Sequence, residues 1–259
     1  MLEITPIPAF DDNYIWMLGK QRSNRFTAVD PGDEEPVLDW LRQRGAELSA
    51  ILLTHHHYDH IGGVPDLIKV YPDIPVYGPS RDRIKGLNHP MVEGDRLILP
   101  GTSVELEVLE VPGHTAGHIA YYGKGTLFCG DTLFAGGCGR IFDGTFDQMA
   151  ESLQRIASLP EETLVFCAHE YTLANLGFAA WVEPESESIK KRLKCEQRKR
   201  DAGDPTLPSM LALELATNPF LRTSQPQVIE AAQRFAGRPL TDHRQVFTTL
   251  RTWKDREYD

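Results

Sequence analysis

One short segment, Thr54–His60, limits what this chain can fold into more than any other feature. It holds four histidines and an aspartate, namely His55, His56, His57, Asp59 and His60. The segment directly follows an apolar, strand-like run, Leu48–Leu53, so burial of that strand fixes the imidazoles rigidly at its end. Imidazoles packed this closely would repel one another when protonated and would be costly to bury without a cation. The segment therefore predicts a metal site at the end of a buried strand.

The spacing within this segment assigns its side chains to different sides. Side chains of an extended segment alternate between faces, so His55 and His57 point one way and His56 points the other. Asp59 and His60 stand where the chain turns into a predicted helix, which can bring them to the far side of the same pocket. The segment thus offers two pairs of ligands to one pocket.

Three further candidate ligands stand at the ends of later strand-like runs. They are His114, after Val104–Val111, Asp131, after Thr126–Cys129, and His169, after Leu164–Cys167. Each alone could equally be a capping or satisfied polar residue. Together with the first segment they complete two sets of three ligands and one carboxylate able to bridge two metals.

The pattern of the whole chain is α/β followed by helices. Other strand-like runs are Ile4–Ala9, Tyr14–Leu18, Phe26–Asp30 and Ile119–Tyr122, and helix-like stretches are Val64–Val70 and Phe146–Leu159. After His169 no comparable strand is visible, and the helical segments are Tyr171–Val182, Glu187–Arg200, Pro208–Ala216, Gln227–Phe235 and Asp242–Trp253. We therefore expect a catalytic domain at residues 1–170 and a helical, substrate-binding domain at residues 171–259.

Composition places the chain among ordinary globular proteins, with 41% hydrophobic and 25% charged residues. No apolar run approaches the roughly 20 residues that span a bilayer, and the N-terminus lacks the pattern of a secretory signal. We therefore expect a cytoplasmic protein that does not contact membranes. The four cysteines are irregularly spaced and are expected to be reduced. The net charge of −10 is concentrated in residues 1–169, which suits cation binding.

A basic run, Lys190–Arg200, raises nucleic-acid binding as an alternative. Glutamates at positions 187 and 196 stand four residues before basic residues, which is the spacing of helical ion pairs. The run has no interleaved aromatic residues for base stacking, and the whole chain is acidic. We expect a solvated helix face and no nucleic-acid partner.

With these motifs in view, the sequence resembles the metallo-β-lactamase-fold superfamily and, within it, the glyoxalase II family of hydroxyacylglutathione hydrolases. The segments that carry the resemblance are Pro8–Tyr14, Val29–Gly32, Thr54–His60, His114–His118, Gly130–Phe134, Gly137–Gly139, His169–Thr172, Asn218–Phe220 and Arg251–Asp255. The last four segments of this set are specific to glyoxalase II. The resemblance implies an αββα sandwich followed by a helical C-terminal domain.

The resemblance also implies a ligand set for two divalent metal ions. His55, His57 and His114 would hold the first ion, Asp59, His60 and His169 the second, and Asp131 would bridge them. Nitrogen and oxygen donors without a thiolate suit zinc, which we expect here, with iron and manganese as alternatives. Asp59, which can orient the nucleophile, and Asp131 would be the catalytic carboxylates.

The implied reaction is hydrolysis of S-(2-hydroxyacyl)glutathione, such as S-lactoylglutathione, in the second step of methylglyoxal detoxification. Two metals would supply a bridging hydroxide that attacks the thioester. Family members grip glutathione through residues that correspond here to Arg140, Tyr171, Arg251 and Lys254. Arg140 replaces a lysine, and Phe142 stands where a tyrosine is common. We expect a monomer that takes a glutathione thioester.

Other functions remain open on sequence alone. Within the superfamily they are a lactonase, a β-lactamase, a ribonuclease and a mononuclear-iron persulfide dioxygenase. A metal-binding regulator that has lost catalysis belongs to another class, although every ligand position is filled. The helical tail with Tyr171, Arg251 and Lys254 favours a glutathione conjugate over the four superfamily alternatives.

Overall fold

The computed structural model describes residues 2–258, which fall into two compact units. The first unit comprises the residues up to Glu110 together with Gly117–Gly130. The second unit comprises Val111–Ala116 and the residues from Asp131 onward. The short segment that carries His114 therefore belongs to the second unit.

A six-stranded mixed sheet forms the centre of the first unit. Its strands lie in chain order: β1 (Leu2–Ala9), β2 (Asn13–Lys20), β3 (Arg25–Val29), β4 (Glu47–Leu52), β5 (Val76–Pro79) and β6 (His89–Met91). The first three strands pair antiparallel, and β3 to β6 pair in parallel. The histidine segment begins where the central parallel strand β4 ends.

Helix α1 (Glu34–Arg44) shows how local sequence sets the elements that cover this sheet. The Asp33 side chain accepts a hydrogen bond from the backbone N–H of Glu35 and so caps the helix. Gly45 ends the helix with a φ of +60°, a conformation that favours glycine. The same unit contains the short helices α2 (Tyr58–Ile61) and α3 (Val64–Val70).

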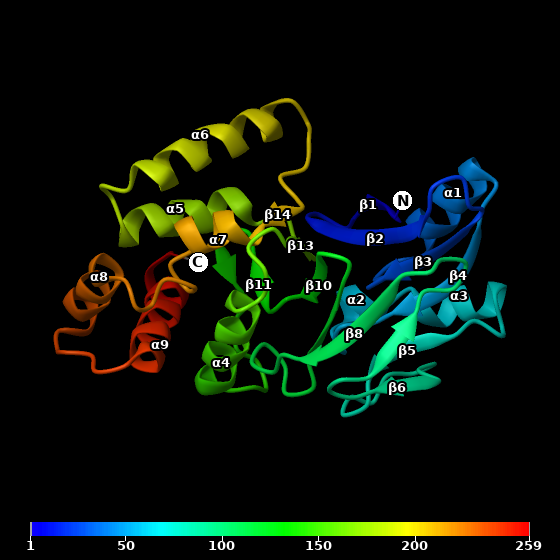
Figure 1. The fold of residues 1–259 in the computed structure, drawn as a ribbon, viewed down its shortest axis with the longest axis horizontal. Coiled ribbons are helices and arrows are strands. Elements are labelled where there is room, and N and C mark those ends of the chain that lie inside the picture. The colour runs from blue at the N-terminus through cyan, green and yellow to red at the C-terminus, as the bar shows by residue number, and fades with distance from the viewer. Residues whose placement is uncertain (1, 259) are drawn as a thin grey trace. The chain divides into compact units, whose positions relative to one another are not determined.

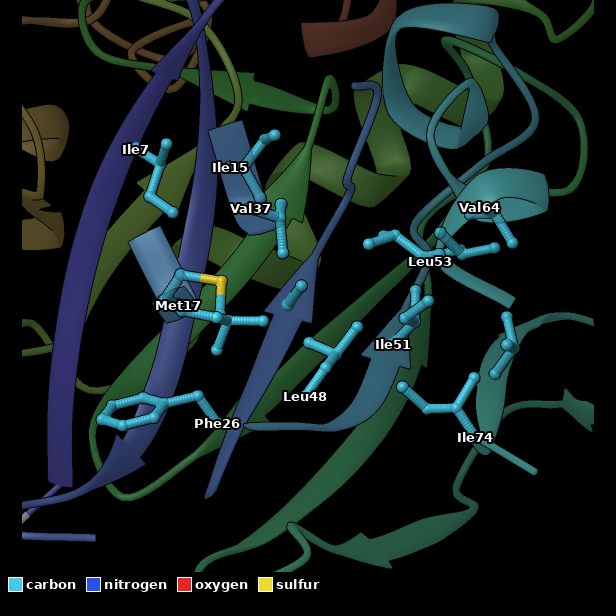
Figure 2. Packing of buried hydrophobic residues seen from close by; sticks show 14 of the residues in the cluster. Ile7, Ile15, Met17, Phe26, Val37, Leu48, Ile51, Leu53, Val64 and Ile74 are labelled. Carbon is cyan, nitrogen blue, oxygen red and sulfur yellow. The ribbon is translucent and has the colours of Figure 1, made fainter. Parts of the chain in front are cut away.

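The core of the first unit packs between this sheet and helices α1 and α3. Its members include, as Figure 2 shows, Ile15, Met17, Ile51, Val37 and Val64. Burying one such side chain stabilises the fold by roughly 1.5–3 kcal/mol, so β4 and the start of the histidine segment have a rigid support.

The remaining strands of the first unit form an antiparallel ladder. In spatial order they are β7 (Arg96–Ile98), β8 (Glu105–Glu110), β9 (Ile119–Gly123) and β10 (Thr126–Gly130). Tyr121 of β9 is fully buried and donates its hydroxyl to the carbonyl of Leu53 at 2.9 Å. This bond fixes the residue before the histidine segment.

The second unit is mainly helical. Its helices are α4 (Phe146–Ala157), α5 (Thr172–Val182), α6 (Glu187–Asp201), α7 (Leu211–Thr217), α8 (Pro226–Ala236), α9 (His243–Trp253) and the π-helix η1 (Lys254–Tyr258). Two small antiparallel pairs accompany them, β11 (Leu133–Phe134) with β12 (Gly137–Cys138), and β13 (Leu164–Cys167) with β14 (Ser209–Met210). Figure 1 shows α5 running beside α6, and α8 beside α9.

Most of the predicted elements are confirmed with shifts of a few residues at their ends. The strands that the sequence did not predict are short, namely β5, β6, β7, β11, β12 and β14. The expectation of no strand after His169 is wrong at β14. A run of two to four residues is too short to show the alternation that identifies a strand.

The expectation of a solvated face along α6 is also wrong in part. Arg192 is 4% exposed and forms an ion pair with Glu214, which is fully buried. The glutamates at positions 187 and 196 pair with lysines three residues further on, one position short of the expected partners. Helix α6 is therefore anchored by a buried charge that composition alone does not reveal.

Candidate functional site

The histidine segment of the first unit brings three imidazoles together. The ring centroid of His55 lies 4.7 Å from that of His57 and 4.1 Å from that of His60. His55 and His60 are fully buried. The backbone is still extended at His57 and turns into α2 at Tyr58, which carries the next two candidate ligands back toward the first pair.

Asp30 supports this segment from the end of β3, a role that the sequence pattern alone did not predict. Its Oδ1 accepts from the backbone N–H of Thr54 at 2.8 Å, and its Oδ2 accepts from the Thr54 hydroxyl at 2.7 Å. The same Oδ2 lies 3.0 Å from His60 Nδ1. Asp30 is buried and has a φ of +50°, a conformation that costs free energy for a non-glycine residue. The signal available in the sequence was the place of Asp30 in Val29–Gly32, one of the segments that carry the family resemblance.

These contacts determine which nitrogen of each imidazole carries the proton. A carboxylate only accepts, so the hydrogen bond between His60 and Asp30 requires Nδ1–H on the imidazole. The Thr54 hydroxyl proton already points to Asp30, so Thr54 Oγ1 accepts from His55 Nδ1, 3.0 Å away. In both neutral imidazoles the lone pair is then on Nε2. This is the arrangement that orients histidines for metal binding.

Asp59 and His60 direct their donor atoms to the same place. The Asp59 Oδ2 lies 3.3 Å from His60 Nε2 and also accepts from Asn13 Nδ2 at 3.0 Å. A carboxylate oxygen facing an imidazole lone pair favours a cation between them. Asn13, at the start of β2, fixes the orientation of this carboxylate.

Two further histidines of the first unit, next to the candidate ligands in sequence or in space, occupy different environments. His56 Nδ1 lies 2.9 Å from Asp82 Oδ2, and its side chain is partly exposed. His118 is fully buried and stacks on His55, with ring centroids 4.6 Å apart and planes at 18°. His118 therefore supports a candidate ligand, and His56 contacts a neighbouring loop.

In the second unit, Asp131 stands between two histidines. Its Oδ2 lies 3.5 Å from His114 Nε2, and its Oδ1 lies 3.4 Å from His169 Nε2. All three side chains are buried. Each carboxylate oxygen thus faces a different imidazole, as a carboxylate that bridges two metals would.

The His114 ring is held by the chain that follows the β11–β12 hairpin. Its Nδ1 donates to the carbonyl of Arg140 at 2.7 Å, which again leaves the lone pair on Nε2. The backbone N–H of Phe142 donates to the carbonyl of His114 at 3.0 Å. The Phe142 ring packs edge-on against the His114 ring and is 65% exposed. The phenylalanine in place of the family's tyrosine thus lines the surface beside a candidate ligand.

Tyr171 packs beside the other candidate ligand of this unit. Its ring stacks on His169 with centroids 4.7 Å apart and planes at 5°. Phe134 packs edge-on against both rings. Tyr171 is 37% exposed, so a substrate bound at this surface can contact its ring and hydroxyl.

Arg251 and Lys254 are buried, rather than solvated as the last turn of an isolated helix would be. Arg251 donates to Asp255 Oδ1 from Nε at 3.1 Å and from Nη2 at 2.7 Å, and to the carbonyl of Cys138 from Nη1 at 3.0 Å. The Lys254 ammonium lies 5.6 Å from the centre of the Tyr258 ring. Arg140 is more exposed, with Nε 3.7 Å from Asp255 Oδ1. Arg251 thus links the hairpin to the C-terminal π-helix.

The donor chemistry of both units fits divalent metals. Each of the seven candidate ligands belongs to a group of side chains able to hold a metal ion. Burial raises the pKa of the Cys138 thiol to about 11 and that of Cys167 to about 12, so both stay protonated near neutral pH. The four cysteines are free, as expected. The donors are thus imidazoles and carboxylates, which suit zinc, iron or manganese.

Comparison with known proteins identifies two matching family models. The model described as Hydroxyacylglutathione hydrolase C-terminus matches residues 170–257, and that of the Metallo-beta-lactamase superfamily matches residues 23–169. The hydroxyacylglutathione hydrolase of Nitrosomonas europaea is 52% identical over 255 residues, covering 98% of this chain and 96% of the relative. That of Alkalilimnicola ehrlichii is 54% identical over 256 residues, covering 98% and 99%.

Solved structures share the fold. The BLEG-1 B3 metallo-beta-lactamase has a TM-score of 0.62 at 24% identity, covering 85% of this chain and 99% of its own. TTHA1623 in a di-iron-bound form has a TM-score of 0.61 at 27% identity, covering 84% and 100%. The expected fold class is confirmed: an α/β metallo-β-lactamase fold with a helical C-terminal part. The helices among residues 2–258 are each too short or too polar to cross a bilayer.

Proposed function

The chain belongs to the hydroxyacylglutathione hydrolase family of the metallo-β-lactamase superfamily, and we propose which of its residues carry out that family's reaction. It is a metal-dependent hydrolase that splits the thioester of S-(2-hydroxyacyl)glutathione into glutathione and a 2-hydroxy acid. With S-lactoylglutathione the acid is lactate, and the reaction is the second step of methylglyoxal detoxification.

We propose that seven side chains hold two divalent ions. His55, His57 and His114 would hold the first, Asp59, His60 and His169 the second, and Asp131 would bridge them. The observation that carries this assignment is the position of Asp131, whose two oxygens lie 3.5 and 3.4 Å from Nε2 of His114 and His169. The family implies divalent metal ions. Zinc is our proposal for their identity.

The protein's own groups orient the reactants. When bound, the metals supply hydroxide at neutral pH, because they lower the pKa of a water molecule. Asp59, held by Asn13, accepts a proton or hydrogen bond from the nucleophile and keeps it facing the carbonyl carbon. A thiolate leaves readily, so the reaction needs no strong general acid.

Substrate recognition is proposed to lie in the second unit. Glutathione carries carboxylates remote from the thioester, and Arg140 and Lys254 supply cations for them. The exposed part of Tyr171 offers a hydroxyl beside His169. The Arg251 guanidinium already donates hydrogen bonds to Asp255 and to the Cys138 carbonyl. We therefore propose that Arg251 shapes the substrate-binding surface and also contributes positive charge to it.

Four broader expectations are kept as proposals. We propose that residues 1–170 form the catalytic domain, which supplies the seven metal ligands, and that residues 171–259 form a helical, substrate-binding domain. We also propose a monomeric, cytoplasmic enzyme with no nucleic-acid or membrane partner. Sedimentation tests the monomeric state, and cell fractionation tests the cytoplasmic location.

A panel of substrates tests the function itself. Purified protein should hydrolyse S-lactoylglutathione at least about 100-fold more efficiently, in kcat/KM, than a lactone, a β-lactam or an RNA oligonucleotide, because only the glutathione conjugate engages both the metals and the basic residues. The relatives that match nearly the whole chain are named hydroxyacylglutathione hydrolases, which does not favour a lactonase, a β-lactamase or a ribonuclease. Comparable efficiency on any of these three, or sulfite production from glutathione persulfide, would reverse this conclusion.

A further inference from the structure

The hairpin of β11 and β12 carries site residues at its base. Asp131 precedes β11, and Arg140 follows β12. The two strands pair through Leu133 with Cys138 and through Phe134 with Gly137. Gly136 at the tip has a φ of +72°, which favours glycine. Strands of two residues form few ladder hydrogen bonds, so contacts from outside must hold this hairpin in place.

Asn218, the residue that ends α7, contacts both strands of the hairpin. Its Nδ2 donates to the carbonyls of Phe134 at 3.2 Å and Gly137 at 2.9 Å. Its Oδ1 accepts from the backbone N–H of Phe220 at 3.1 Å, which fixes the orientation of the amide. The side chain is fully buried. One carboxamide therefore ties the two strands together just below the tip.

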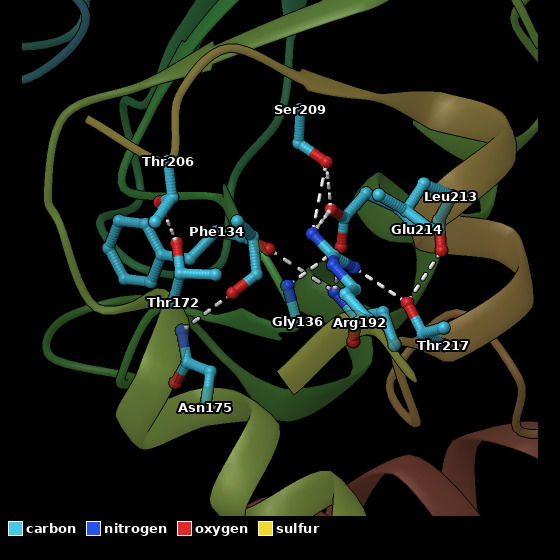
Figure 3. A network of polar contacts seen from close by, with 12 residues as sticks. Phe134, Gly136, Thr172, Asn175, Arg192, Thr206, Ser209, Leu213, Glu214 and Thr217 are labelled. Atoms are coloured by element: carbon cyan, nitrogen blue, oxygen red, sulfur yellow. Dashed lines mark hydrogen bonds and ion pairs between the residues drawn. The ribbon is translucent and has the colours of Figure 1, made fainter. Parts of the chain in front are cut away.

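Glu214, one helical turn earlier, contacts the tip itself. Its Oε2 accepts from the backbone N–H of Gly136 at 2.8 Å (Figure 3). The same oxygen accepts from Asn218 Nδ2 at 3.2 Å. Two side chains, Glu214 from α7 and Asn218 from its C-terminal cap, thus fix the outer half of the hairpin.

Arg192 of α6 holds this carboxylate from the other side. Arg192 pairs with Glu214 Oε1 and donates from Nη1 to the Thr217 hydroxyl at 2.6 Å and from Nη2 to the Ser209 hydroxyl at 3.0 Å. Figure 3 shows the guanidinium between these groups. A buried ion pair is weak evidence of added stability, since well-packed apolar residues often do as well. Here it determines where the other carboxylate oxygen points, which is toward the hairpin.

The base of the hairpin is packed against two metal-ligand candidates. A Cβ added at Gly139 would lie 2.0 Å from the carbonyl oxygen of Asp131 and 3.0 Å from His114 Nδ1. The backbone N–H of Gly139 donates to the carbonyl of Thr132 at 3.3 Å. With so little free space, a shift of the hairpin displaces Asp131 and the carbonyl of Arg140 that orients His114.

We infer that Asn218, backed by Glu214 and Arg192, is a positioning residue for the hydrolase reaction. It acts through the hairpin, which places the Asp131 carboxylate between His114 and His169. The inference rests on the proposed function, which specifies the reaction. The contacts of Asn218 themselves lie within the second unit.

The test compares Asn218→Ala with Ser209→Ala, which disturbs the same network without contacting the hairpin. Hydrogen exchange of residues 131–140, followed by mass spectrometry, reports on the hairpin, and titration of metal-stripped protein with Zn²⁺ reports on the metal site. Asn218→Ala should raise exchange about 10-fold and weaken Zn²⁺ binding about 10-fold. It should also lower kcat for S-lactoylglutathione more than it raises KM. Ser209→Ala should stay within about 2-fold of the unchanged protein in every measurement.

A third variant, Asn218→Ser, keeps one donor and should recover part of each effect; it also serves if Asn218→Ala does not fold. Unchanged exchange and Zn²⁺ affinity in Asn218→Ala would overturn the inference, as would equal changes in Ser209→Ala. Hydrogen exchange and Zn²⁺ titration are both measured without substrate. Failure of the unchanged protein to hydrolyse S-lactoylglutathione would count against the proposed function alone, and exchange and metal affinity would still decide the role of Asn218.

Discussion

Asp30 Oδ2 lies 3.0 Å from His60 Nδ1, and both side chains are buried. The carboxylate holds the proton on Nδ1 and so leaves Nε2 for a metal. Partners of this kind change metal affinity or activity by about 10–100-fold when they are lost. If His60 is a metal ligand, as proposed, Asp30 supports the metal site without being a ligand.

The first prediction concerns this residue. Asp30→Asn should weaken binding of Zn²⁺ to metal-stripped protein by about 10-fold or more, because an amide cannot accept from His60 and Thr54 as the carboxylate does. Asp33→Asn is the matched control, since asparagine caps helix α1 nearly as well as aspartate. Equal Zn²⁺ affinities in the two variants would show that Asp30 does not orient His60.

A second prediction concerns the proposed bridge. Asp131→Ala should lower bound metal below two equivalents and reduce turnover of S-lactoylglutathione to background, since two cations would lose their shared counter-charge. Asp131→Asn keeps the shape of the side chain and removes the charge, so it should bind metal almost as poorly. Metal analysis beside the thioesterase assay gives the result. Full activity with two metals retained would exclude the bridging role.

The histidines should differ in importance according to their contacts. His57→Ala and His114→Ala should lose metal, whereas His56→Ala should retain it, because His56 contacts Asp82 and belongs to none of the metal-ligand groups found among residues 2–258. His118→Ala should fall between these, since it removes the ring that stacks on His55. Metal content is measured for all four variants. An equal fall in each of them would contradict this order.

Substitution of Arg251 and substitution of Lys254 should have different effects, the first on stability and the second on KM. Arg251→Ala should destabilise the fold by roughly 1.5–3 kcal/mol, because it removes charged hydrogen bonds to Asp255 and the Cys138 carbonyl. Lys254→Ala should raise KM for S-lactoylglutathione a few fold at unchanged metal content, since a remote cation contributes uniform binding. Thermal melts and steady-state kinetics distinguish the two. A KM unaffected by Lys254→Ala would remove this residue from the substrate site.

Much of the fold was predictable because long elements repeat a pattern. Helix α9 shows its apolar period and its Asp242 cap in the sequence, and β4 is a continuous apolar run before the histidines. Strand β14 has only two residues and is formed by pairing with β13, so no local pattern identifies it. Short strands depend on tertiary partners, and the sequence alone does not name those partners.

The supporting residues of the site were harder to predict than the candidate ligands. Four histidines within six residues form a local signal, whereas Asp30 contacts Thr54 and His60 from 24 and 30 positions away. Arg192 stands in a basic run that resembles a solvated face, and only its contact with Glu214 reveals its burial. Long-range hydrogen bonds carry no sequence periodicity.

The most direct test of the central claim follows S-lactoylglutathione hydrolysis while metal-stripped protein is reloaded with Zn²⁺. Two metals acting together should give activity that rises mainly with the second equivalent, reaches a plateau near two per chain, and is abolished by a chelator. Full activity in the stripped protein, or a plateau at one equivalent, would contradict a two-metal thioester hydrolase.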